Sequence, residues 1–106
     1  MLKQVRIDAY GKIVDADRDT HTTRAAACDG PDRVQWLRVP GVTAKFTVRF
    51  VPGPFQPGSP FRPGAQDIDV RGDPPQEVTQ AVGRYKYSVL DSTGRETDDP
   101  DVIIDS

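Results

Sequence analysis

Two stretches, KFTVRFV at residues 45–51 and GRYKYSVL at residues 83–90, decide the fold class of this chain. In both, large apolar side chains alternate with polar ones. Because successive side chains of a β-strand point to opposite faces, this period of two predicts two strands, each with one buried face. We expect the aromatic residues of these strands to form one core with the single tryptophan; they are Trp36, Phe46, Phe50, Tyr85 and Tyr87.

Shorter extended runs, separated by turn residues, occupy much of the remaining chain. We predict them at residues 4–10, 13–14, 33–39, 68–70, 77–82 and 102–104, with a hairpin-like loop at 91–95. Residues 20–28 fit an edge strand or a short helix, and their three threonines favour the strand. With 12 Val, 8 Thr and only 3 Leu in 106 residues, seven or eight short strands predict a single all-β domain over residues 1–106, built as a sandwich or a barrel.

The composition argues against several classes of function. One cysteine, Cys28, allows no internal disulfide, and one histidine, His21, leaves too few ligands for a Cys/His zinc site. A formal net charge of -2 argues against a nucleic-acid partner. No apolar run is long enough to cross a membrane and the first residues carry no leader pattern, so we expect no membrane association and a cytoplasmic location. Residues 91–106 hold six acids against Arg95, and we expect this acidic end to face solvent.

Several segments resemble the cupredoxin family, the Greek-key β-sandwich that includes plastocyanin. The resemblance covers roughly residues 31–106. It is carried by DRVQW at 32–36, FTVRF at 46–50, GRYKYSV at 83–89 and the ending DPDVII at 99–104. The resemblance implies a cupredoxin-like sandwich of about seven to eight short strands.

The copper ligands of that family are missing here. Blue-copper sites use two histidines, a cysteine and a weak axial methionine. Carried over by position, the first histidine falls near Phe46, the cysteine at Val89 and the second histidine near Ser92, and no methionine follows. The resemblance therefore implies the fold without copper, and we expect no metal and no other cofactor.

Residues 52–64 form a Pro/Gly-rich loop that contains a short repeat. Pro-Phe-Gln-Pro-Gly at 54–58 recurs as Pro-Phe-Arg-Pro-Gly at 60–64, and the loop holds five prolines. Proline lacks the N–H needed in a central strand, so this segment lies outside the sheets. Two hypotheses remain open: Phe55 and Phe61 either fold back to plug one end of the sandwich, or they form an apolar contact surface together with Arg62.

No catalytic constellation is visible, so we expect a non-catalytic protein-interaction or accessory module with an unidentified protein as its partner. His21 has no recognisable nucleophile or oxyanion arrangement beside it. The alternative function is a small-molecule or calcium binder that uses the Asp15–Asp19 turn. This turn has three alternating aspartates, but Thr20 and Ala26 stand where an EF-hand loop needs Gly and Glu.

Overall fold

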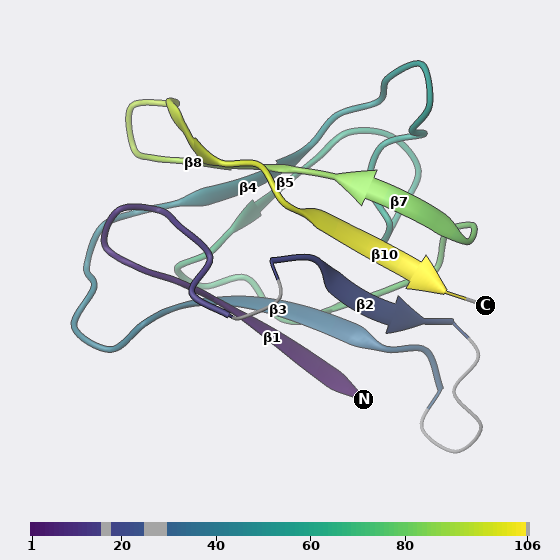
Figure 1. Cartoon of the computed structure of the whole chain (residues 1–106), viewed down its shortest axis with the longest axis horizontal. Helices are drawn as coiled ribbons and strands as arrows, with labels where there is room; N and C mark the ends of the chain where they lie inside the picture. The colour runs from purple at the N-terminus through teal and green to yellow at the C-terminus, as the bar shows by residue number, and fades with distance from the viewer. Residues whose placement is uncertain (16–17, 25–29, 106) are drawn as a thin grey trace.

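The computed structural model describes residues 1–15, 18–24 and 30–105. Within these ranges the chain contains no helix, and its ten strands form three sheets (Figure 1). The all-β prediction is therefore confirmed. The strands are β1 (Leu2–Ile7), β2 (Thr20–Thr23), β3 (Arg33–Arg38), β4 (Thr47–Phe50), β5 (Gln66–Asp69), β6 (Gln76–Glu77), β7 (Gly83–Lys86), β8 (Ser88–Leu90), β9 (Glu96–Asp98) and β10 (Asp101–Asp105).

The first sheet has the strand order β1-β3-β6. β1 and β3 are parallel, with Val5 opposite Trp36, whereas β6 is antiparallel to β3. A parallel pair cannot be joined by a tight turn. Here the connection runs through β2, which pairs with β10 in another sheet. The chain thus leaves the first sheet after β1 and returns to it in β3.

The second and third sheets are joined by one long hairpin. The antiparallel pairs Lys86–Asp101 in one sheet and Val89–Asp98 in the other share the same register. At the junction, the Tyr87 N–H donates a hydrogen bond to the Pro100 carbonyl oxygen at 3.1 Å. Pro100 has no N–H to return a bond, which explains why the long strand at 83–90 divides into β7 and β8.

The remaining strands extend both sides of this hairpin. β4 pairs with β8 and β5, which gives the antiparallel order β5-β4-β8-β9. β2 pairs in parallel with β10, which gives the order β2-β10-β7. Of the residues expected to form an edge strand or a helix at 20–28, those at 20–23 are an edge strand, and 25–29 lie outside the described residues.

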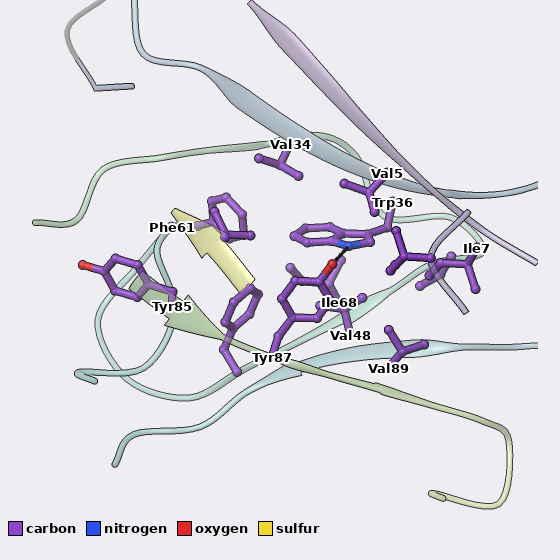
Figure 2. Close-up of a cluster of buried hydrophobic side chains, with 14 of the residues drawn as sticks. Val5, Ile7, Val34, Trp36, Val48, Phe61, Ile68, Tyr85, Tyr87 and Val89 are labelled. Atoms are coloured by element: carbon purple, nitrogen blue, oxygen red, sulfur yellow. Dashed lines mark hydrogen bonds between the residues drawn. The ribbon is translucent and has the colours of Figure 1, made fainter. Parts of the chain in front are cut away.

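The core lies between the β1/β3 side chains and those of β4, β5, β7 and β8 (Figure 2). The predicted aromatic core is confirmed, because all five aromatic residues named above are buried. The Trp36 ring packs edge-on against Phe50, Phe61 and Tyr87, with ring centroids 5.3–6.1 Å apart. Edge-to-face aromatic pairs stabilise a core beyond their buried area.

The acidic C-terminal end faces solvent only in part: Glu96, Asp99 and Asp105 are exposed, as expected. Asp98 and Asp101 are buried. Asp98 accepts a hydrogen bond from the Ile13 N–H at 2.9 Å and pairs with Arg18, while Asp101 pairs with Arg84. Buried carboxylates need such partners, and Asp98 thereby fastens residues 13 and 18 onto the hairpin. β9 was also not predicted, because its sequence Glu-Thr-Asp has no apolar alternation and its extended form comes from pairing with β8.

Candidate functional site

The two copies of the Pro-Phe-x-Pro-Gly repeat have opposite orientations. The side chain of Phe61 is buried, with 7% of the residue exposed, whereas Phe55 is 98% exposed. The sequence left a plug and a contact surface as alternatives for both rings. The structure divides them: Phe61 is the plug, and Phe55 projects into solvent.

Phe61 is held inward by its own segment and by the residues that precede β7. Its ring packs edge-on against Trp36 and Phe50, each with centroids 5.8 Å apart. The Phe61 N–H donates to the Ser59 hydroxyl at 3.0 Å, and its carbonyl oxygen accepts from the Thr79 hydroxyl at 2.7 Å. The second repeat is therefore part of the core.

Phe55 stands at the tip of a narrow turn whose base is fixed by Gln56. The Gly53 N–H donates to the Gln56 carbonyl oxygen at 2.8 Å. The Gln56 side chain donates to the Lys86 carbonyl oxygen at 2.9 Å and accepts from the Lys86 N–H at 2.7 Å. Its amide thus bonds to the backbone of β7 in the way a neighbouring strand would.

The same amide also ties the two ends of the first repeat together. Gln56 Nε2 lies 3.3 Å from the Val51 carbonyl oxygen and 3.1 Å from that of Gly58. Prolines at 52, 54 and 57 restrict the conformations of this segment further. Phe55 is consequently a fully exposed aromatic ring on a backbone held in one shape.

Arg62, in the second repeat, lines a shallow groove of about 480 Å³. The groove runs between the end of β4 and the start of β5. Its lining residues are Arg49, Phe50, Val51, Arg62, Ala65, Gln66 and Asp67. Val51, which is 56% exposed, links this groove to the Phe55 turn through its hydrogen bond with Gln56.

The charged groups along the groove differ in whether an opposite charge compensates them. Arg49 and Asp67 form a two-point ion pair with both N–O distances at 2.8 Å. These hydrogen bonds lower the pKa of Asp67 and raise that of Arg49, so both groups stay charged and compensate each other. Arg62 is exposed, and its guanidinium donates only to the Ala65 carbonyl oxygen at 3.3 Å among the residues described.

The positions that the cupredoxin resemblance assigns to copper ligands are occupied by groups unable to bind copper. Phe46 and Val89 are buried among core side chains. Ser92 is exposed in the turn between β8 and β9. The expectation that the protein binds no copper stays a prediction, which metal analysis tests directly.

The Asp15–Asp19 turn is described at its two ends, whereas Asp17 lies outside the described residues. Asp15 pairs with Arg6 at 2.9 Å and Asp19 with Arg84 at 3.2 Å. Both aspartates line a second groove of about 330 Å³ together with β1 residues and His21. Over residues 1–15, 18–24 and 30–105, no three His, Cys, Asp or Glu side chains gather as a metal site would require.

His21 and Cys28 are the single histidine and the single cysteine of the chain. The His21 imidazole lies 3.5 Å from the Asp105 carboxylate, and both side chains are more than half exposed. Cys28 lies outside the described residues. The residue that sequence reasoning missed is Gln56, since no local pattern shows that an amide in a loop will bond to a strand 30 positions away.

Comparisons with known proteins leave the chain without an assigned family. No family model, no curated protein and no solved structure matches it. In the part of the chain that the structure describes, there is no helix long and apolar enough to span a membrane. The residues that the structure describes therefore define a small all-β protein. It has three sheets and a loop that exposes Phe55 on a turn fixed by Gln56.

Proposed function

We propose that this protein is a non-catalytic protein-interaction module, and that its contact surface is the Phe55 turn with the neighbouring Arg62. The observation that carries the proposal is the 98% exposure of Phe55 on a turn clamped by Gln56. A fully exposed phenylalanine leaves a large apolar area in water. Covering that area on a partner supplies binding free energy, and aromatic and arginine side chains dominate interface hot spots.

The rigid base of the turn supports this function for an entropic reason. A flexible loop loses conformational freedom when it binds, and this loss weakens the complex. Here the prolines and the Gln56–Lys86 hydrogen bonds have already removed that freedom during folding. The turn therefore presents the backbone of Phe55 in one place, and only the side-chain torsions of Phe55 remain to be ordered on binding.

We also propose that the strands have a cupredoxin-like, Greek-key arrangement. It is supported by the path of the chain, which passes between sheets and so places β1 beside β3 and β2 beside β10 instead of forming successive hairpins. The lack of copper and the cytoplasmic location expected from the sequence stay predictions. A fold by itself does not assign a function, so the interaction role rests on the loop.

The alternative is a small-molecule or calcium binder at the Asp15–Asp19 turn. The groove lined by Asp15, Asp19 and His21 favours it. Against it, Arg6 and Arg84 already compensate both carboxylates. Calcium that binds only the folded protein would raise its melting temperature; an unchanged melting temperature at millimolar calcium would exclude the calcium form of this alternative.

Affinity capture from a lysate of the native host, quantified by mass spectrometry, tests the interaction role. Phe55→Ala should lose the proteins that the wild type captures. Tyr10→Ala is the matched control, since Tyr10 is also a strongly exposed aromatic ring in a turn, 81% exposed, and follows β1 in the chain. A folded Phe55→Ala protein that captures every wild-type partner at the wild-type level would refute the proposed site.

A further inference from the structure

The loop belongs to a stretch of sequence that lacks acidic residues. Between Asp32 and Asp67 the sequence contains no acidic residue, while it contains five basic ones: Arg33, Arg38, Lys45, Arg49 and Arg62. The loop lies inside this segment, and the groove is lined by residues of this segment and by Asp67. The acids at the end of the chain do not compensate Arg62, because the ion pairs of Asp98, Asp99 and Asp101 are made with Arg18, Arg84 and Lys86.

The groove combines this charge with an apolar floor. Val51 and Ala65 follow β4 and precede β5 in the same register, so they lie side by side on the face that carries Arg49 and Asp67. The lining includes the Arg49–Asp67 pair, which is neutral as a unit. It also includes Arg62, for which no carboxylate lies within ion-pair distance among residues 1–15, 18–24 and 30–105.

We propose that this groove binds an extended acidic segment of the partner protein. A carboxylate of the segment pairs with Arg62, and an apolar side chain beside it packs on Val51, Ala65 and the exposed ring of Phe55. The inference rests on the proposed interaction function and adds the chemistry of the partner. A basic segment is disfavoured, because it would meet Arg62 with a like charge and compete with Arg49 for Asp67.

A nucleic acid fits this surface less well than an acidic peptide. Binding a phosphate backbone requires several uncompensated cations along its path. The groove offers one, since Arg49 is held by Asp67. One cation beside an apolar strip instead matches a peptide in which an acidic residue alternates with an apolar one.

The test is a titration of the ¹⁵N-labelled protein, followed by amide chemical shifts. The probes are a blocked decapeptide that alternates Asp with Phe and Leu, its counterpart with Lys in place of every Asp, and a decathymidine. We expect the acidic peptide to shift the amides of Val51, Ala65 and Asp67, and to shift those of Tyr10 and Thr93 little. High salt should weaken the binding, because the charge pair is solvent-accessible.

Charge-reversal variants test the acidic-segment inference separately from the proposed interaction function. Arg62→Glu should weaken binding of the acidic peptide by about five- to tenfold, as expected for a partly exposed charge pair that becomes repulsive. Lys45→Glu, the same charge reversal at an exposed position before β4, should leave binding unchanged. Equal binding of the Lys peptide, preferential binding of decathymidine, or an unaffected Arg62→Glu variant would overturn the acidic-segment inference.

Failure of the proposed function can be distinguished from failure of the acidic-segment inference. If the acidic peptide fails to bind while Phe55→Ala still abolishes partner capture, the partner's chemistry is wrong and the contact site is retained. If the peptide shifts amides only at the opposite end of the strands, the groove is not its site and the inference fails. The peptide experiment and the capture experiment therefore give distinguishable answers.

Discussion

Trp36 Nε1 donates a buried hydrogen bond to the Tyr87 hydroxyl oxygen at 3.1 Å (Figure 2). The bond joins β3 of the first sheet to the junction between β7 and β8. It satisfies the indole N–H, which would otherwise lose its water partner on burial at a cost in free energy. The hydrogen bond between Trp36 and Tyr87 thus constrains the position of the first sheet relative to β7 and β8.

Replacing Tyr87 by Phe should lower the free energy of unfolding by about 1–3 kcal/mol, because the indole N–H of Trp36 is left without its acceptor. Urea denaturation followed by tryptophan fluorescence measures the change. Tyr10→Phe, at a strongly exposed position, is the control and should unfold at the wild-type midpoint. An unchanged midpoint for Tyr87→Phe would mean that the hydrogen bond contributes nothing to stability.

Tyr87 should also make the fold sensitive to alkali. Burial raises the pKa of its hydroxyl above the ordinary value of about 10. The unfolded chain then releases this proton at a lower pH than the folded one, so stability is fully present below about pH 10 and is lost as the pH rises above it. In urea midpoints measured between pH 8 and 11, wild type should lose more stability than Tyr87→Phe. Parallel curves would contradict this assignment.

The two repeat phenylalanines should differ sharply in their effect on stability. Phe61→Ala removes a ring from the core and should cost about 3–5 kcal/mol. Phe55→Ala removes an exposed ring and should change stability by less than about 0.5 kcal/mol. Thermal and urea unfolding of the two variants measure the contrast directly. Equal destabilisation would show that both rings are packed in solution.

The two glycines Gly58 and Gly64 offer a second matched pair. Both have positive φ angles, +121° and +86°. A Cβ at Gly58 would lie 2.2 Å from the Gly64 carbonyl oxygen, whereas one at Gly64 would meet no atom within 4 Å. Gly64→Ala should therefore cost about 1 kcal/mol from backbone strain alone, and Gly58→Ala clearly more, because backbone atoms must move. Similar unfolding midpoints would contradict the close approach of Gly58 to the Gly64 carbonyl oxygen.

Copper analysis tests the departure from the blue-copper pattern. Protein exposed to Cu²⁺ and then dialysed should retain no stoichiometric copper and show no blue absorption, since Phe46, Val89 and Ser92 provide no imidazole or thiolate. Retained copper at one ion per chain would overturn the positional assignment. The metal measurement needs no knowledge of the partner.

The two main strand segments and the aromatic core of this protein follow from the sequence by itself. In the segments at 45–51 and 83–90 the alternation is strong, and burying one face of each leaves little choice of secondary structure. The prolines at 52–64 likewise exclude a central strand there. These are local properties, because they depend on side-chain period and on the covalent limits of proline.

Only the tertiary structure decided which phenylalanine of the repeat is buried and which charges remain uncompensated. Phe55 and Phe61 have nearly the same neighbours in sequence, yet Trp36, Phe50 and Thr79 hold Phe61 inside while the Gln56–Lys86 bonds hold Phe55 outside. Asp98 and Asp101 similarly became buried because cations distant in sequence reach them. The physical reason is that packing and ion pairing are set by neighbours in space, which a local sequence pattern does not contain.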